Sequence, residues 1–469
     1  MIDLLREEIG TSLQDIELKI FMELRKVFGE ALKRVLEHLD DMILSLRESR
    51  FKVREMVETN LETLLGVAVR FKRRHYKDSV TGRCVYLLDE VLGIGKGSQV
   101  SPALTDLMLH LATVMSYRDA EDSLKQFYGH RPVSHETIRQ AIIKIGKSLE
   151  DINEDAIANP KGKRKVDIVF IEADGLYVSL QREKKRNTEE FNAVIYEGWE
   201  PRTPGSKDFK LVNPRLYRTH EGQEFWEKAS RYVYSIYDID DNTMVVINGD
   251  RAKWIRQGIN YFPNAIYQVD RFHLKRDLRS IFGKNSKAIA KLFEALDSDD
   301  TTGATFLEEL AKAKSGLRGE KAKECQKLLN DLATIAESTV DYRKRLEALN
   351  RPTKGLRGLG AAEGNMARYA KRVKGKRSWR PKGLAAMMEI LSWKYSERQI
   401  VSTTRVNEML EHVQFTPKAI KRATTKAISK VVGVNNTWNA TVPIKNSGRI
   451  YSGGMSNFIN NLNKGGIPI

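Results

Sequence analysis

Residues 245–255, VVINGDRAKWI, decide the fold prediction. A β-branched apolar run ends at Gly249 and Asp250, and a helical pattern follows at once. This pattern places a carboxylate at the carboxyl end of a buried strand, where α/β folds build their sites. Residues 169–175, VFIEADG, repeat the arrangement, with Asp174 after the apolar run. Two such aspartates in a basic chain indicate a metal-dependent enzyme acting on nucleic acid.

The charge of the chain favours a polyanionic partner. Its 469 residues include 79 Lys and Arg against 61 Asp and Glu, a net charge of +18. Nucleic acid leads the partners expected for so basic a chain. Two cysteines, Cys84 and Cys325, argue against a disulfide framework. No signal peptide pattern and no apolar run of roughly 18 residues is present, so we expect a soluble, cytoplasmic, nucleoid-associated protein without a membrane partner.

Residues 159–282 are predicted to form the first part of an α/β core. Strand candidates lie at 166–180, 191–196, 214–220, 244–248 and 265–270, with helical segments at 223–234 and 252–261. Three neighbouring strands, a helix, and strands that then alternate with helices follow the order of a ribonuclease-H-like fold. In that order the strand from Val166 brings Asp174 beside Asp250.

Paired carboxylates at this edge suit two-metal chemistry. Cleavage of a phosphodiester needs charge stabilisation on the attacking and leaving oxygens, which two Mg²⁺ ions about 3.5–4 Å apart supply. Such ions take hard oxygen ligands, so a third acid is expected from a later helix. Glu363 is the candidate, because residues 351–394 hold twelve Lys or Arg and only one other acid, Glu389. The apolar neighbours of Glu389 indicate a core helix instead.

The rest of the carboxyl-terminal half is predicted as three regions. Residues 283–350 form an all-helical insertion or, alternatively, an independent helical domain. Residues 351–400 hold the last catalytic helix and a basic DNA-binding segment, followed by a basic region at 401–469. The candidates for phosphate contact are Arg368, Lys371, Arg372, Lys374, Lys376, Arg377 and Arg380, and Trp379 is the candidate for stacking on an unpaired base.

A mainly helical DNA-binding region is predicted ahead of the core. Residues 1–60 contain one amphipathic helix, at 10–48, which packs on its own domain or forms a dimer contact. Residues 61–158 hold a small β element, with strands at 67–76 and 83–88, and a helix-turn-helix candidate at 116–144. His135, Thr137, Arg139 and Gln140 face the DNA in that candidate. The polar linker at 159–165 marks the predicted boundary with the core.

Six motifs carry a resemblance to a known family. They are LLDE at 87–90, SYRDA at 116–120, EADG at 172–175, NGDRAKWI at 248–255, VDRFHLKRDL at 269–278 and AAEGN at 361–365. With them the chain resembles DDE-type transposases over essentially its whole length, in particular the ISLre-type insertion-sequence transposases near the Mutator-like branch. The resemblance implies a ribonuclease-H-like core interrupted by helices.

The same resemblance implies a site and an activity. Asp174, Asp250 and Glu363 match the metal-binding triad, which takes two Mg²⁺ ions with Mn²⁺ as a substitute, and Asp270 and His273 match accessory positions. Arg251 departs from the glycine of many relatives, so it contacts phosphate or marks a different loop shape. The implied reaction is cleavage at insertion-sequence ends and strand transfer into double-stranded target DNA by a homo-oligomer, at least a dimer. The alternatives are a catalytically inactive DNA-binding descendant and a ribonuclease-H-like nuclease without strand transfer.

Overall fold

The computed structural model describes residues 12–95, 97–284, 287–298, 300–398, 400 and 415–432. It divides into two compact units, Met1–Ala141 with Ile400–Ile469 (unit 1) and Ile142–Gln399 (unit 2). The division differs from the predicted boundary at 159–165, because that linker is bonded into unit 2. Gly162 N donates to Tyr234 O at 2.9 Å, and Asp238 N donates to Arg164 O at 3.0 Å. No helix of the described residues is long and apolar enough to cross a membrane.

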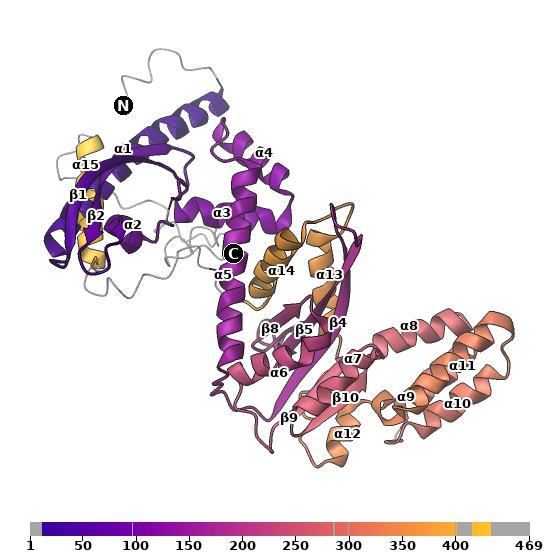
Figure 1. The fold of residues 1–469 in the computed structure, drawn as a ribbon. Helices are drawn as coiled ribbons and strands as arrows, with labels where there is room; N and C mark the ends of the chain where they lie inside the picture. The colour runs from indigo at the N-terminus through magenta and orange to yellow at the C-terminus, as the bar shows by residue number, and fades with distance from the viewer. Residues whose placement is uncertain are drawn as a thin grey trace. The chain divides into compact units, whose positions relative to one another are not determined.

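Unit 1 begins with the predicted amphipathic helix, α1 (Leu13–Leu46), drawn in Figure 1. Its carboxyl-terminal half packs on an antiparallel sheet and on α2 (Leu87–Leu92), which confirms packing on its own domain. The strands are β1 (Phe51–Glu62), β2 (Ala68–Asp78) and β3 (Cys84–Val85). The described part of the 401–469 region is one helix, α15 (Pro417–Val432), which also contacts α1.

Two sequence predictions differ from the structure in unit 1. The twelve-residue strand β1 crosses the expected domain boundary at residue 60. The sequence did not predict this strand, because only Phe51 and Leu61 of β1 are buried. So few inward side chains give no apolar alternation to detect. The strand expected at 83–88 is also shorter, since helix α2 begins at Leu87.

The helix-turn-helix candidate at 116–144 contains two helices, α4 (Tyr117–Tyr128) and α5 (His135–Ala158), and α3 (Pro102–Val114) precedes them. Ser116 and Asp119 form a capping box at the start of α4, and Ser134 Oγ accepts Thr137 N at 3.1 Å at the start of α5. Helix α5 has 24 residues and extends beyond the expected end at 144. Its buried apolar positions, which continue the helical spacing past that end, are Ile138, Ile142, Ile145 and Leu149.

Unit 2 is a mixed α/β unit around a five-stranded sheet of order β10-β9-β4-β5-β8. The strands are β4 (Ile168–Ser179), β5 (Asn187–Tyr196), β8 (Arg215–Thr219), β9 (Met244–Gly249) and β10 (Ala265–Val269). Strands β4, β9 and β10 run parallel, whereas β5 is antiparallel to both β4 and β8. A separate pair is formed by β6 (Trp199–Pro201) and β7 (Phe209–Leu211).

Helices cover the sheet of unit 2. Because alternate residues of a strand face opposite sides, Val169, Ile171 and Ala173 point into one core, which also contains side chains of α6 (Phe225–Ile236). Glu172 and Asp174 point to the other side, where α13 (Ala361–Val373) contacts β4. The neighbouring helix α14 (Pro381–Tyr395) packs on β8 (Figure 1). Short helices, α7 (Lys253–Arg256) and the 3₁₀ helices Gly222–Glu224 and Gln257–Tyr261, complete this part.

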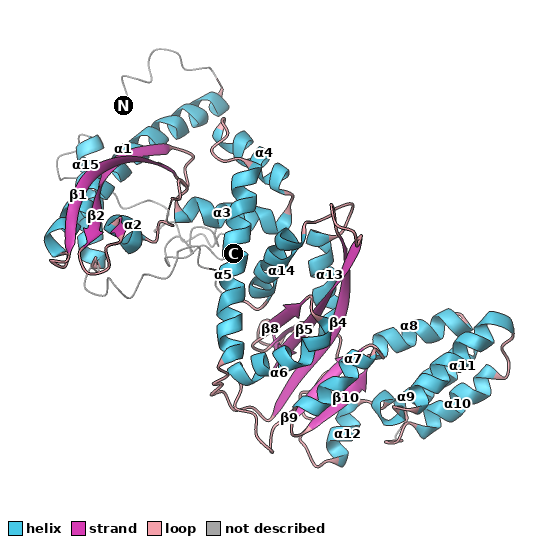
Figure 2. Ribbon diagram, in the orientation of Figure 1, coloured by secondary structure: helices cyan, strands magenta, loops and turns pink. Residues whose placement is uncertain are grey.

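The predicted insertion is helical and belongs to unit 2 (Figure 2). It follows α8 (Arg271–Phe282) and consists of α9 (Lys287–Asp297), α10 (Ala304–Lys314), α11 (Gly319–Ala333), the 3₁₀ helix Ala336–Thr339 and α12 (Tyr342–Ala348). Buried Leu292, Leu310 and Leu332 share one hydrophobic core with the strand residues. The helices of the insertion therefore share a hydrophobic core with the sheet and belong to the same compact unit.

Candidate metal centre

Asp174 lies on β4, and Asp250 directly follows the end of the neighbouring parallel strand β9. Strand pairing aligns Ala173 of β4 with Gly249 of β9, and the two aspartates are the next residues along. Asp174 Oδ1 accepts Gly175 N at 2.8 Å, and Asp250 Oδ1 accepts Ala252 N at 2.9 Å. Each carboxylate is half-buried and keeps one oxygen outside these local hydrogen bonds.

Gly249 lets the two strands approach closely at this point. A Cβ at Gly249 would lie 2.7 Å from Ala173 O and 2.7 Å from Ile255 Cδ1, closer than side chains pack. The residue before Asp250 must therefore lack a side chain. This is the physical reason for glycine in the Asn248-Gly249-Asp250 corner.

Glu363 and His273 reach the same place from two helices. Glu363 is in the first turn of α13 with its side chain 50% exposed, and its Oε2 lies 3.5 Å from His273 Nε2 in the first turn of α8. One ligand atom from each of Asp174, His273 and Glu363 can be chosen so that all lie within 4.8 Å of one another. The structure thus groups Asp174 and Glu363 with His273, and Asp250 borders this group.

Burial and neighbouring charges shape the electrostatics of the group. Burial raises the pKa of Asp174 to about 6. The Gly175 N–H and His273 lower that pKa, whereas the charges of Asp250 and Glu363 raise it. Carboxylates that disfavour one another's ionisation are stabilised by a cation, and oxygen ligands with one imidazole suit Mg²⁺ or Mn²⁺. The donor set therefore fits a divalent ion.

A fourth carboxylate, Glu172, lies behind this group and is 1% exposed. Its Oε1 accepts the Tyr196 hydroxyl at 2.5 Å, and its Oε2 accepts Asn248 Nδ2 at 3.0 Å. Backbone N–H groups of Gly360 and Ala362 also donate to Oε2, at 2.9 and 3.3 Å. The sequence reading missed Glu172, although the EADG motif contains it and its spacing from Asp174 puts both on one strand face.

Asp270, an expected accessory residue, caps helix α8. Its Oδ1 accepts His273 N at 2.8 Å, and its Oδ2 accepts Asn248 Nδ2 at 3.0 Å. The side chain is buried. Asp270 therefore fixes the first turn of the helix that carries His273.

Arg251 forms two ion pairs within unit 2. Its Nη2 lies 2.7 Å from Asp277 Oδ2 of α8, and its Nε lies 3.0 Å from Asp331 Oδ2 of α11. The residue after Asp250 thus connects the end of β9 to the helical insertion. Of the two expected roles, this geometry agrees with a distinct loop shape.

The four expected DNA readers of α5 have local partners. His135 Nδ1 lies 2.6 Å from Glu121 Oε2, and Thr137 Oγ1 lies 3.0 Å from Ser134 Oγ. Glu136 accepts two hydrogen bonds from Arg139 and one from Gln140. To contact DNA bases, these side chains must break these local hydrogen bonds and form new ones with the bases.

Two residues of the basic segment were assigned wrongly to DNA contact. Trp379 is 7% exposed and donates Nε1–H to Val373 O at 2.9 Å. Arg372 is 3% exposed, and its guanidinium carbon lies 4.8 Å from the Trp379 ring centre. The pair packs between α13 and α14 instead of facing solvent. Arg377 is half-buried and bonds the end of α13. The exposed members of the set are Arg368, Lys371, Lys374, Lys376 and Arg380.

Glu389, the rival third acid, is confirmed as a core residue. It is 4% exposed, and its carboxylate accepts Asn153 Nδ2 at 2.6 Å and Arg218 Nε at 3.2 Å. These partners account for both of its oxygens. Glu389 therefore takes no part in the group around Asp174.

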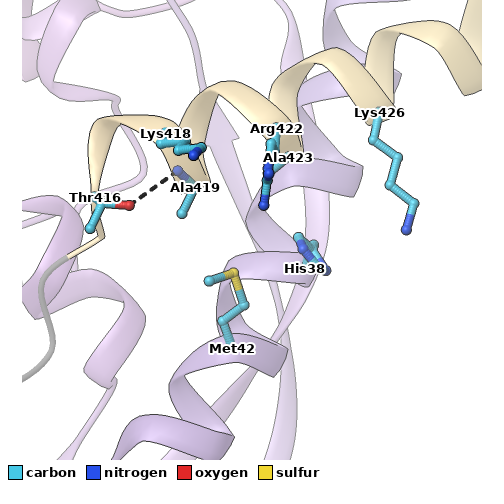
Figure 3. Close-up of a pocket in the computed structure, with 8 residues that line it drawn as sticks. All are labelled: His38, Met42, Thr416, Lys418, Ala419, Arg422, Ala423 and Lys426. Carbon is cyan, nitrogen blue, oxygen red and sulfur yellow. Dashed lines mark hydrogen bonds between the residues drawn. The ribbon is translucent and has the colours of Figure 1, made fainter. Parts of the chain in front are cut away.

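Unit 1 carries a separate cationic groove between α1 and α15, shown in Figure 3. Its volume is about 410 Å³, and its lining consists of His38, Met42, Thr416, Lys418, Ala419, Arg422, Ala423 and Lys426. Helix α15 contains five cationic residues and no acid. None of these cations forms an ion pair with another described residue, since nearby carboxylates of α1 bind β2 instead, as Asp40 and Asp41 bind Arg74.

Comparison with known proteins places the chain in a family. Residues 6–407 match the uncharacterised protein family UPF0236, and the chain belongs to it. A UPF0236 protein of Caldanaerobacter subterraneus subsp. tengcongensis, whose name joins eleven locus numbers, is 26% identical over 333 residues, covering 70% of this chain and 68% of the relative.

A second relative and one solved structure extend the comparison. The UPF0236 protein in the vanSb 3′ region of Streptococcus gallolyticus is 24% identical over 390 residues, covering 81% of this chain and 82% of the relative. The Drosophila P element transposase strand transfer complex aligns with 72% of this chain and 93% of its own, at 13% identity and a TM-score of 0.25. At that TM-score the likeness supports no conclusion about function.

Proposed function

We propose that this protein is a DDE-type transposase that cleaves DNA at insertion-sequence ends and transfers the strand into target DNA. The observation that carries the proposal is the group formed by Asp174, His273 and Glu363, with Asp250 on the adjacent strand. Four chain segments that are far apart in sequence supply these side chains. Their convergence at one sheet edge supports a catalytic centre.

The sheet supports a ribonuclease-H-like core. Three antiparallel strands, β8, β5 and β4, continue into the parallel strands β9 and β10. The first aspartate then lies on the central strand, the second at the end of β9, and the glutamate on a helix after the insertion. This is the placement that the resemblance to DDE-type transposases implies.

The proposed cofactor is a pair of Mg²⁺ ions, with Mn²⁺ as a substitute. Asp174, Asp250 and Glu363 are the proposed ligands. When bound, the ions stabilise charge on the attacking and leaving oxygens of the phosphodiester. His273 lies where it can hold or accept a proton beside Glu363. The half-exposed Glu363 leaves the centre open to a DNA strand.

The relatives support a mobile element. The name of the Caldanaerobacter relative joins eleven loci of one bacterial genome under a single UPF0236 protein. Multiple copies are expected for a gene that moves and are not required of a repair nuclease. We therefore favour strand transfer over the alternative of a nuclease without it.

Double-stranded DNA is the proposed partner. Exposed cations on α13 and after it flank Glu363, and the groove between α1 and α15 adds a second cationic surface. Such surfaces bind the phosphate backbone. Pairing of two DNA ends requires at least a dimer, and exposed Leu13, Leu18 and Leu24 make the first half of α1 the proposed contact.

An assay of cleavage and strand transfer tests the proposal. The substrate is DNA that carries the ends of the element flanking the gene, with Mg²⁺ or Mn²⁺. We expect nicked ends and joined products that depend on the metal. Cleavage without joining would favour the nuclease alternative, and DNA binding without either product would favour the inactive descendant.

A further inference from the structure

We propose that Glu172 is a positioning residue that sets the distance between Asp174 and Glu363. The inference rests on the proposed function, because its purpose is to assemble that metal centre. Glu172 and Asp174 lie on the same face of β4, and Glu363 lies on α13. A direct bond between β4 and the start of α13 fixes one acid relative to the other.

Glu172 supplies the cap that α13 lacks. The N-cap residue of α13 is Gly360, which has no side chain to accept the first N–H groups. Helix starts leave such groups without intrahelical partners. Glu172 Oε2 accepts Gly360 N at 2.9 Å and Ala362 N at 3.3 Å. The cap therefore comes from the strand that bears Asp174, 188 positions earlier in the chain than Gly360.

The charge of Glu172 has no cationic side chain to balance it. Among the described residues, no Lys, Arg or His nitrogen lies within ion-pair distance of its carboxylate. Burial of an unpaired carboxylate is unfavourable unless hydrogen bonds and dipoles compensate for the lost hydration. Here four donor groups and the positive end of the α13 dipole do so. The carboxylate and the start of α13 stabilise each other.

Asn248 extends the same connection to His273. Its Nδ2 group donates to Glu172 Oε2 at 3.0 Å and to Asp270 Oδ2 at 3.0 Å, so both amide hydrogens are used. Asp270 in turn caps the helix that carries His273. A reversed amide would turn its oxygen toward two carboxylates, which fixes the orientation of Asn248. Two buried side chains thus hold β4, β9, α8 and α13 in register.

The substitution E172Q tests this role with little change in shape. An amide replaces one carboxylate oxygen, so one acceptor becomes a donor that faces other donors. The start of α13 then loses its charged cap, and Glu363 loses its fixed distance from Asp174. Substitution of a residue that orients metal ligands typically lowers metal affinity by about 10–100-fold. We therefore expect E172Q to lower the affinity for Mn²⁺ by about tenfold or more.

The experiment compares the full-length wild type with E172Q and with E389Q, an equally buried carboxylate outside the metal centre. Mn²⁺ affinity is measured by titration with electron paramagnetic resonance, and amide exchange of residues 360–362 is measured in EDTA. Both variants are expected to lower the melting temperature. Only E172Q is expected to weaken Mn²⁺ binding and to accelerate exchange at 360–362.

Wild-type Mn²⁺ affinity in E172Q, or equal weakening in E389Q, would overturn the inference. If E172Q does not fold, N248A removes the hydrogen bonds from Asn248 to Glu172 and to Asp270 and leaves the bonds from Gly360 and Ala362 to Glu172 in place. It is expected to weaken Mn²⁺ binding several-fold, and unchanged affinity in N248A would overturn the inference as well. Failure of the wild type to cleave DNA, with the Mn²⁺ and exchange effects present, would contradict the transposase but not the positioning role. Absence of Mn²⁺ binding by the wild type would overturn both.

Discussion

Nε2 of His273 lies 3.5 Å from Oε2 of Glu363. The two residues belong to the first turns of α8 and α13, so the contact joins the helix before the insertion to the helix after it. Histidine side chains often serve as general acids or bases in active sites. The pair therefore places a proton-exchanging group beside a proposed metal ligand.

Replacement of His273 by alanine should slow cleavage while DNA binding persists. General acid–base groups typically contribute 10²–10⁴-fold to a rate, so we expect a loss of about 10²-fold or more. Single-turnover cleavage and a DNA-binding titration measure the two effects. H220A, which removes an exposed histidine of unit 2, serves as the control. A rate within about threefold of wild type in H273A would exclude a proton-transfer role.

The ionised carboxylate of Asp174 should destabilise the folded, metal-free protein above about pH 6. Burial raises the pKa of Asp174 to about 6 in the folded state, above its ordinary value of 3.8. The folded state then holds its proton more tightly than the unfolded state, so stability falls as pH rises from about 4 to 6. We expect D174N in EDTA to be more stable than wild type by about 1–3 kcal/mol at pH 7.5, and by much less at pH 4.

Urea titrations at the two pH values measure this difference. If D174N is more stable than the wild type by the same free energy of unfolding at both pH values, ionisation of Asp174 is not the cause of the difference. A D174N protein less stable than wild type at pH 7.5 would contradict the predicted cost of burying the charge.

Arg251 should act on stability rather than on DNA affinity. R251G, which installs the residue expected in relatives, removes the ion pairs to Asp277 and Asp331. Partly exposed pairs each contribute about 0–1 kcal/mol, so we expect a loss of about 1 kcal/mol. A double-mutant cycle of R251G with D331N measures the coupling. A large loss of DNA affinity with unchanged stability would instead assign Arg251 to phosphate contact.

Charge reversal on α15 should weaken DNA binding and its dependence on salt. The triple variant K418E/R422E/K426E reverses the cations of the groove in Figure 3. Each lost phosphate contact reduces the slope of log K against log salt by about 0.9, so three contacts reduce it by nearly 3. The matched control reverses three exposed lysines of the insertion, K291E/K312E/K323E. An equal effect in both variants would show that only net charge matters.

Local patterns predicted most of unit 2. Strand β9 and the first half of β4 are apolar runs that end at polar residues, and such runs are visible in sequence. Strand β1 was missed because only Phe51 and Leu61 of it are buried. The pattern of apolar residues therefore predicts strands that face a core and misses strands that face solvent.

Side-chain partners that are distant in sequence were beyond prediction. Arg372 and Trp379 look like DNA contacts in a basic segment, yet they pack on each other, and charge alone does not distinguish the two cases. Glu172 was overlooked because its partners lie 76 and 188 positions away. The spacing of residues indicates which face a side chain occupies but not which distant group it meets.

The most direct test of the central claim is metal-dependent cleavage of element-end DNA by wild type and by D174A, D250A and E363A. Each variant removes one proposed metal ligand. The account predicts that each substitution abolishes cleavage with Mg²⁺ and with Mn²⁺ while DNA binding persists. Folded E389A, the control, is predicted to retain metal-dependent cleavage. Wild-type cleavage in any of the three variants would remove that residue from the triad and contradict the account.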